Sequence, residues 1–230
     1  MRNLYRPLLA AALVTVFAAT SCTKAPQDEN RGLRPEAVVL LAYANTSPIS
    51  SADILCSGVV AAGLIITARH CVRDGQRLRV VADPVDLCDQ TPDMGTPLTS
   101  PWQIPNPRAD IAVARATLPG SPRPPTAAGA PGTFVVTGWG TRPGHPIRCT
   151  SRTITLKPAS GCGDDDTTLC LTGAQENTCT GDSGAGVLDH TGELIAIVTA
   201  GNSCHAGAPG TYTRLGPLMT WARHHGLATS

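Results

Sequence analysis

Short runs of β-forming residues, separated by clusters of Gly, Pro and Asp, make up most of the chain from Glu36 onward. They read AVVLLAY, GVVAAGLIITA, RLRVVAD and DIAVARA in the first half, and TFVVTGWG, TITLKP and GELIAIVTAG in the second. Short strands with turn signals at this spacing are typical of an all-β barrel or sandwich. The last segment, GPLMTWARHHGLATS, instead has apolar residues at helical spacing between Pro217 and Gly226, which predicts a short amphipathic helix.

Two stretches rich in Pro, Gly and polar residues divide the chain. The stretch LPGSPRPPTAAGAPG, at 118–132, cannot form a helix or a central strand, and we interpret it as a crossing between β domains. The stretch TKAPQDENRGLRP, at 23–35, has the composition of a tether. A chain of 230 residues is long enough for one large or two small β domains with a buried core.

The first residues, MRNLYRPLLAAALVTVFAATSC, have the features of an export signal. Arg2 and Arg6 carry the only charges, and the apolar run that follows is too short to span a bilayer, so we predict a secretory signal at 1–21. Cys22, directly after small residues, resembles the lipidated cysteine of bacterial lipoproteins, although Ala19 stands where a larger aliphatic residue is usual. The alternative is an ordinary signal peptide followed by an incidental cysteine.

The chain contains nine cysteines and few aromatic residues, which make up 3% of it. Export places the cysteines in an oxidising compartment, where disulfides persist and compensate for a core of small aliphatic side chains. If Cys22 carries a lipid, eight cysteines remain, and spacing alone cannot choose among their 105 possible pairings. The formal net charge of +1, without a basic run, argues against a nucleic-acid partner.

Three polar residues stand in settings that suggest nucleophilic catalysis. Ser183 lies in NTCTGDSGAG, which taken alone is equally well explained as a tight turn. His70 ends the apolar run LIITARHCV, and Asp110 opens the run ADIAV; singly, such residues are usually structural. Together they supply what an activated serine needs, which is a base that takes its proton and a carboxylate that orients the base.

These segments resemble the trypsin/chymotrypsin-like serine proteases. TARHC is similar to that family's TAAHC, with Arg69 in place of an alanine, and DIAVARA is similar to its DIxLLxL strand. VTGWG, at 136–140, is identical to the family sequence, and CTGDSGAG is similar to CxGDSGGP. PGTYTRL, followed by Trp221, resembles PGVYTxV and the terminal helix, so the resemblance runs from about Val38 to Leu227.

The resemblance implies a serine endopeptidase that acts on a protein or peptide substrate without a cofactor. Ser183 is then the nucleophile, His70 the residue that takes and returns the proton, and Asp110 the group that orients His70. The family's oxyanion donors are two backbone amides, which correspond to Gly181 and Ser183. An imidazole, with an intrinsic pKa near 6.5, suits this proton transfer near neutral pH.

The resemblance also implies the fold, which is two Greek-key six-stranded β-barrels with a short C-terminal helix. With the features above, it divides the chain into a signal peptide at 1–21, a tether at 22–35, an N-terminal barrel at 36–120, a crossing at 121–132, a C-terminal barrel at 133–216 and a helix at 217–228. We expect an exported monomer, attached to the bacterial envelope only through a lipid on Cys22, or otherwise secreted.

The cysteines can be paired by the same resemblance. It pairs Cys56 with Cys71, Cys162 with Cys170 and Cys179 with Cys204, and leaves Cys88 for Cys149. We expect no metal site, because the remaining histidines do not lie at metal-ligand spacing with the cysteines. The DDD run at 164–166 is expected to be a solvated loop rather than a calcium site.

The resemblance places the base of the substrate pocket at Asn177, with Thr199, Gly201 and Gly210 along the pocket. The trypsin subclass carries an aspartate at the base, which pairs with Arg or Lys of the substrate. An amide lacks that charge, so we expect an open pocket that accepts medium-sized polar or apolar residues. Glu176, the neighbour of Asn177, is the other carboxylate that could attract a basic residue.

One departure from the family concerns activation. Its members usually mature by a cut that exposes Ile-Val-Gly-Gly, whose new amine pairs with the aspartate before the nucleophile, here Asp182. No such sequence lies between Cys22 and the first strand, and acylation would block the Cys22 amine. Either a cut after Arg31 frees the amine of Gly32, or Asp182 has an internal donor. We favour the internal donor, because few residues separate Arg31 from the first strand.

A catalytically silent binding module on the same fold stays open, because the activation sequence is missing. An esterase of the α/β-hydrolase type does not fit, because its nucleophile lies in a G-x-S-x-G elbow and precedes the acid and the histidine. Here Ser183 comes last.

Overall fold

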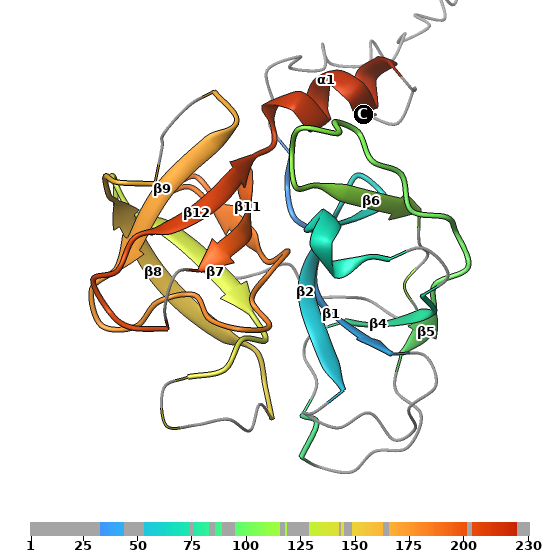
Figure 1. Ribbon diagram of the computed structural model, residues 1–230, viewed down its shortest axis with the longest axis horizontal. Helices are drawn as coiled ribbons and strands as arrows, with labels where there is room; N and C mark the ends of the chain where they lie inside the picture. Colours follow the sequence, from blue (N-terminus) through green and yellow to red (C-terminus); the bar gives the residue numbers. More distant parts are fainter. Residues whose placement is uncertain are drawn as a thin grey trace, which may run out of the picture. The chain divides into compact units, whose positions relative to one another are not determined.

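The computed structural model describes residues 33–43, 53–73, 76–82, 86–88, 95–115, 118, 129–142, 144, 149–162, 166–201 and 204–224. The chain divides into two compact units, 1–30 and 31–230, and every described residue belongs to the second. That unit contains two six-stranded antiparallel sheets and a C-terminal helix (Figure 1), which confirms the all-β prediction. The predicted signal peptide and Cys22 lie outside the described residues.

The N-terminal sheet has the strand order β5-β4-β1-β2-β3-β6. Its strands are β1 (Ala37–Tyr43), β2 (Ile54–Ala61), β3 (Leu64–Thr67), β4 (Leu78–Ala82), β5 (Thr96–Pro97) and β6 (Ala112–Arg115). The apolar run of β1 is continuous because both of its faces are covered. Val39 and Leu41 pack with Ile65 inside the sheet, whereas Leu40 packs with Trp139 of the C-terminal half.

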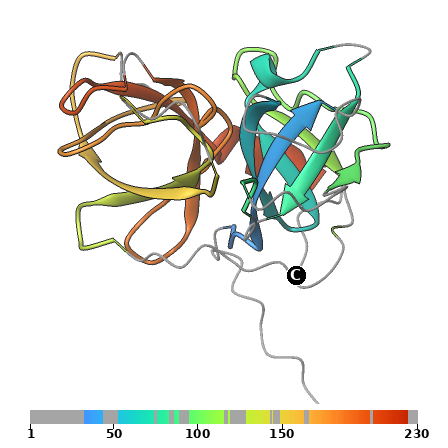
Figure 2. The same cartoon turned by 90° about the horizontal axis from the view of Figure 1, so that it is seen from below.

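The C-terminal sheet is a closed barrel with the order β10-β11-β12-β9-β8-β7, visible as a ring in Figure 2. Its strands are β7 (Phe134–Gly138), β8 (Arg152–Pro158), β9 (Thr168–Gly173), β10 (Gly186–Leu188), β11 (Leu194–Gly201) and β12 (Gly210–Arg214). Buried and exposed residues alternate along β8, so that Ile154 and Leu156 enter the core. Arg152, the first residue of β8, lies on the same buried face.

The two sheets have the same connectivity but close differently. In the C-terminal barrel, β11 and β12 pair from Ala196 with Arg214 to Gly201 with Gly210. The corresponding strands of the N-terminal sheet, β5 and β6, do not pair with each other; β6 instead forms a bridge between Val113 and Gln103. A cavity of about 510 Å³ lies at this gap, lined in part by residues of both strands.

Helix α1 (Gly216–His224) closes a core that both sheets share. Leu218 of the helix packs with Ile66 of β3 and Ile197 of β11 in one apolar cluster. The prediction placed this helix at 217–228, and residues 225–230 lie outside the described part of the chain. Among the described residues, no helix is long and apolar enough to cross a membrane.

The described end of the predicted 22–35 tether is attached to the C-terminal barrel. The backbone of Leu33 pairs with that of Leu194, and the Arg34 guanidinium donates to the Thr191 carbonyl at 2.6 Å. Backbone pairing therefore holds the last residues of the predicted tether against the barrel. Of the predicted crossing, 121–128 lie outside the description, and Pro131 and Gly132 form a turn before β7.

Four disulfides join the described segments. They link Cys56 to Cys71, Cys88 to Cys149, Cys162 to Cys170 and Cys179 to Cys204, which are the pairs that the family resemblance implies. The Cys88–Cys149 bridge is the one that joins the segment after β4 to the segment before β8, and so links the two sheets covalently.

Candidate active site

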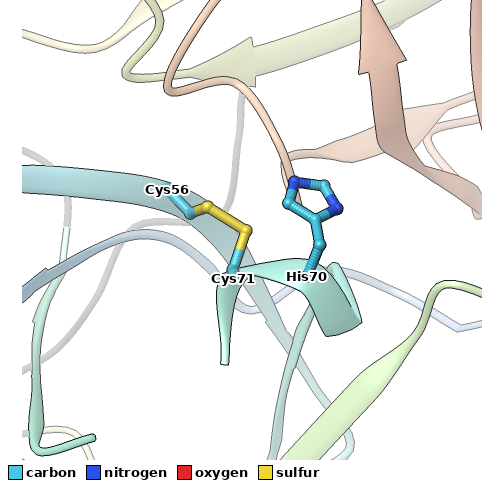
Figure 3. Close-up of side chains that lie close together, drawn as sticks. All are labelled: Cys56, His70 and Cys71. Carbon is cyan, nitrogen blue, oxygen red and sulfur yellow. A yellow bond between two sulfur atoms is a disulfide. The ribbon is translucent and has the colours of Figure 1, made fainter. Parts of the chain in front are cut away.

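His70 lies at the end of β3, on the short 3-10 turn η1 (Arg69–Cys71). The apolar strand LIIT brings the chain to the rim of the sheet, where Ala68, with φ −72° and ψ 139°, leads into the turn. A disulfide from Cys71 to Cys56 of β2 fixes the turn beside the histidine (Figure 3). The imidazole is thus carried by a short, cross-linked element.

Asp110 lies directly before β6, after a turn that Asn106 stabilises through its side chain and its carbonyl. Both carboxylate oxygens of Asp110 face His70. Oδ2 is 2.7 Å from the His70 Nδ1, and Oδ1 accepts the His70 backbone N–H at 2.9 Å. The side chains are partly open to solvent, with exposed fractions of 47% for His70 and 31% for Asp110.

The pKa of the Asp110 carboxyl lies below its usual value. Partial burial acts in the other direction and raises the pKa, but hydrogen bonds from the His70 side chain and backbone, and the charges of His70 and Arg69, lower it by more. Asp110 is therefore ionised across the neutral range. An ionised carboxylate on Nδ1 selects the imidazole tautomer whose Nε2 is free to accept a proton.

Ser183 lies in a tight turn between β9 and β10. Hydrogen bonds from the Asp182 N–H to the Cys179 carbonyl and from the Ala185 N–H to the Asp182 carbonyl, at 2.9 and 2.8 Å, close the turn. Gly181 has φ +96°, a conformation that side chains with a Cβ rarely adopt. Within the described part of the chain, the N–H groups of Gly181 and Ser183 donate to no other group, as an oxyanion site requires.

The turn is held against the N-terminal sheet by Ser57 of β2. The Ser57 N–H donates to the Ser183 carbonyl at 2.9 Å, and the Ser57 hydroxyl donates to the Gly181 carbonyl at 2.8 Å. Gly184, with φ +85°, lies so close to the Thr67 hydroxyl and the Ser57 carbonyl that a Cβ would overlap both. A glycine is therefore needed where the nucleophile turn meets the strand that leads to His70.

The Ser183 backbone also lies next to the histidine turn, because its carbonyl is 3.9 Å from the Cys71 Sγ. The Ser183 hydroxyl and the His70 ring, both within the described residues, are not hydrogen-bonded to each other in this structure. Such contacts commonly form only when substrate is bound. The structure thus places His70 and Asp110 in contact and brings the Ser183 turn to the same rim.

Asp182 is fully buried, and its carboxylate accepts hydrogen bonds from Gly140, Cys179 and Arg152. Oδ1 accepts the Gly140 N–H at 2.7 Å, and Oδ2 accepts the Cys179 N–H at 2.8 Å. The third donor is the Arg152 guanidinium, whose Nη2 lies 2.6 Å from Oδ2. Arg152 is not among the site residues predicted from the sequence. The available signal was a charged residue on the buried face of RTITLKP.

Of the predicted pocket residues, Asn177 lies in the segment after β9, Thr199 and Gly201 lie near the end of β11, and Gly210 begins β12. Asn177 is buried, its Nδ2 donates to the carbonyls of Ala208 and His205, and its Oδ1 accepts the Thr178 N–H at 2.9 Å. Gly201 pairs with Gly210 between β11 and β12, and the Thr199 hydroxyl donates to the Thr211 carbonyl at 3.1 Å.

Two clusters of potential metal ligands occur among the described residues. One contains His70 with Cys56 and Cys71 (Figure 3), and the other contains Asp86 with Cys88 and Cys149. In both clusters the sulfur atoms belong to disulfides, so neither cluster offers the thiolates that bind metal ions. The His70 cluster is a cross-linked turn beside an imidazole.

Comparison with known proteins agrees with this architecture. The chain is similar in fold to mouse neuropsin, a serine protease expressed in the limbic system of the brain, with a TM-score of 0.59 and 21% sequence identity over 83% of this chain and 94% of the other. At this identity the likeness concerns the fold alone. The family model called Trypsin matches residues 38–222, which include both sheets and the site described above. The chain therefore belongs to the trypsin family.

Proposed function

We propose that this protein is a serine endopeptidase in which Ser183, His70 and Asp110 act together. The observation that carries the proposal is the pair of hydrogen bonds between His70 and the Asp110 carboxylate, on the rim that also receives the Ser183 turn. Membership of the trypsin family supports a protease with a protein or peptide substrate.

In this mechanism the Ser183 oxygen attacks the scissile carbonyl while its proton passes to the His70 Nε2. The oxyanion forms opposite the free N–H groups of Gly181 and Ser183, which stabilise it. The C–N bond then breaks, His70 returns the proton to the leaving amine, and an acyl group stays on Ser183. Water then attacks the acyl carbonyl while His70 takes its proton. The bond to the Ser183 oxygen breaks, His70 returns the proton to that oxygen, and the carboxylic acid product is released.

We further propose that the substrate pocket does not select Arg or Lys. All polar atoms of the Asn177 amide are used inside the protein, and Glu176 forms ion pairs with Arg152 and Arg142 at 3.2 and 3.3 Å. Neither group is left to attract a basic side chain. In a peptide library we expect less than about a tenfold preference for Arg or Lys before the scissile bond, whereas a hundredfold preference would contradict this pocket.

Replacing Ser183 by alanine tests the proposed function. We expect Ser183→Ala to lower kcat for peptide hydrolysis on the order of 10⁴-fold or more, with the melting temperature unchanged. Ser160→Ala is the matched control, because Ser160 is exposed in the turn after β8, and its activity should equal that of the wild type. Activity of Ser183→Ala within tenfold of the wild type would refute the assignment.

A silent binding module is the second candidate, because the family's activation sequence is absent and Ser183 is not bonded to His70 here. The two candidates differ in the reactivity of Ser183. An organophosphonate probe should label the proposed protease at Ser183, and a silent module should remain unlabelled.

We also propose that the protein is exported and held at the membrane by a lipid on Cys22. The four disulfides support export, because they persist in oxidising compartments. In a bacterial host, labelled palmitate should be incorporated into the wild type and not into Cys22→Ser. Equal labelling of both would contradict the anchor.

A further inference from the structure

The C-terminal barrel contains a buried ion pair that takes no part in the proposed proton transfer. It joins Arg152, at the start of β8, to Asp182, at the residue before the nucleophile. The exposed fractions of the two side chains are 5% and 0%, so both charges are removed from water. A charged side chain is stable in a buried position only when it is paired and its remaining donors or acceptors are hydrogen-bonded.

The Arg152 guanidinium uses its donors in several directions. Besides Asp182, it donates to the Glu176 carboxylate and to three backbone carbonyls, those of Gly140, Thr141 and Asn177, at 3.1 to 3.2 Å. The planar fork of an arginine, with five N–H groups, suits such a set of acceptors, and a point charge such as an ammonium does not. Arg152 therefore connects β8, the segment after β7 and the nucleophile turn.

The Asp182 carboxyl group packs closely against the VTGWG segment. A Cβ on Gly138 would lie 2.6 Å from the Asp182 Oδ1, and a Cβ on Gly140 would overlap the whole carboxyl group. The glycines of VTGWG are thus what makes room for this side chain.

The segment that leads into β1 lies at another place on the barrel. Leu33 pairs with Leu194 at the start of β11, and Arg34 donates to Thr191 in the turn between β10 and β11. A cut after Arg31 would leave the new amine of Gly32 one residue from the fixed Leu33. Asp182 meanwhile accepts hydrogen bonds from Gly140, Cys179 and Arg152, which all belong to the C-terminal half of the chain.

We propose that Arg152 is a built-in positioning residue that holds Asp182, and with it the oxyanion amides, so that the chain is active without N-terminal cleavage. The inference rests on the proposed protease function. Asp182 lies between Gly181 and Ser183, and its carboxylate also binds the Cys179 N–H. Because the carboxylate is tied to β8 by Arg152, the peptide units that carry the two oxyanion N–H groups are held in one orientation.

The test compares two variants of the full-length chain that both lose an ion pair with Glu176. Arg152→Met removes the contact with Asp182, whereas Arg142→Met removes a guanidinium that binds Glu176 and not Asp182. Loss of an oxyanion donor lowers kcat by about 10²- to 10³-fold in serine proteases. We therefore expect Arg152→Met to lower kcat about 100-fold or more with KM within about threefold, and Arg142→Met to stay within about threefold of the wild type.

Two further measurements separate a positioning role from a general loss of structure. Arg152→Ala should regain at least about tenfold in rate when methylguanidine is added, because the small cation can occupy the vacated site. If Arg152→Met does not fold, the double variant Arg152→Met/Asp182→Asn, which leaves no unpaired buried charge, replaces it. That variant should fold and remain at least about 30-fold slower than the wild type.

The pH profile supplies a readout that differs between an arginine and a chain amine. The guanidinium of an arginine is not deprotonated in proteins. Burial, offset in part by a hydrogen bond with Thr178 and reinforced by the Asp182 charge, raises the pKa of Tyr212 to about 12. The wild-type kcat/KM should therefore be level from about pH 8 to 10. A chain amine, with an ordinary pKa near 8, would lose its charge in that range.

The outcomes for this inference and for the protease function can be told apart. Activity of the full-length chain, together with the loss in Arg152→Met and its rescue, supports the role of Arg152. If the full-length chain is active and Arg152→Met and the double variant both equal it, this inference is wrong and the protease function stands. It is also wrong if only a form cut after Arg31 is active. If neither form hydrolyses peptides, the protease function itself fails.

Discussion

Each half of the chain contains a carboxylate paired with a cationic or basic side chain, Asp110 in the N-terminal half and Asp182 in the C-terminal half, and the two pairs differ in their access to water. In the N-terminal half, His70 and Asp110 lie 2.7 Å apart and are 47% and 31% exposed. In the C-terminal half, Arg152 and Asp182 lie 2.6 Å apart and are 5% and 0% exposed. The two N–O distances are nearly equal, so the pairs differ chiefly in how far their side chains are exposed to solvent.

This difference matches what each pair has to do in the proposed mechanism. His70 must take up and release a proton in every turnover, which requires an imidazole that solvent and substrate can reach. Asp182 must keep a backbone turn in place, which requires a fixed carboxylate held by several hydrogen bonds rather than one that exchanges protons with solvent. The closure of the two sheets fits these different roles. The C-terminal barrel, which holds the buried pair, is fully closed, whereas β5 and β6 of the N-terminal sheet do not pair with each other.

The largest effect on rate is expected at the exposed pair. Asp110→Asn should lower kcat on the order of 10⁴-fold, because the amide favours the wrong tautomer of His70. The free energy of unfolding should change by less than about 1 kcal/mol, since the pair is open to solvent. Asp189→Asn, which removes another hydrogen-bonded and partly exposed carboxylate, serves as the control and should keep full activity. A rate loss below about tenfold in Asp110→Asn would argue against the triad.

The largest effect on stability is expected at the buried pair. Asp182→Asn should lower the free energy of unfolding by about 3 to 5 kcal/mol, because Arg152 keeps a buried charge without its main counter-charge. Urea unfolding of Asp182→Asn and Asp110→Asn, side by side, measures the contrast. Equal midpoints for the two variants would show that burial does not distinguish the pairs.

An intermediate effect is expected at the disulfide that joins the two sheets. Cys88 and Cys149 are 61 residues apart, so the paired change Cys88→Ser/Cys149→Ser should cost about 2 to 4 kcal/mol of stability. The rate should stay within about threefold of the wild type, because the bonds of Arg152 are made inside the barrel. A much slower enzyme would mean that the bridge, and not Arg152 alone, sets the geometry of the turn.

The smallest effect is expected in how the stability contributed by Asp110 changes at acid pH. The pKa of Asp110 is lower in the folded protein than the ordinary value of 3.8, so its pairing stabilises the fold above that value and the contribution is lost as the pH falls through the lowered one. The difference in stability between the wild type and Asp110→Asn should therefore be constant down to about pH 4 and shrink below it. A difference that vanishes already at pH 6 would contradict the pairing.

Much of the fold, and the positions of the three candidate catalytic residues, could be predicted because their signals are local. LIITARHC predicts a strand leading to His70, which in the structure ends at Thr67, and the glycines around Ser183 predict a tight turn. The role of Arg152 could not be predicted in this way. Its partner lies 30 positions away, and the two meet only because β7 and β8 pair with Gly138 opposite Arg152, which brings the guanidinium beside VTGWG.

The backbone contact at the described end of the predicted tether could not be predicted for a related reason. LRP has the composition of a loop, and Leu33 is held by backbone bonds to Leu194, a contact that composition does not reveal. The specificity residues were placed by resemblance, but the structure changes what Asn177 is expected to do. Because its Nδ2 faces two carbonyl oxygens, Asn177→Asp would set a carboxylate against them instead of offering a charge to substrate.

The central claim is that an uncut chain has a reactive Ser183, with Asp182 held from within. It is tested most directly by treating the full-length protein with an organophosphonate probe and measuring the intact mass and the labelled peptide. We predict one adduct, on Ser183, in molecules whose chain is unbroken at Arg31. An adduct found only in molecules that begin at Gly32, or none on Ser183, would contradict the claim.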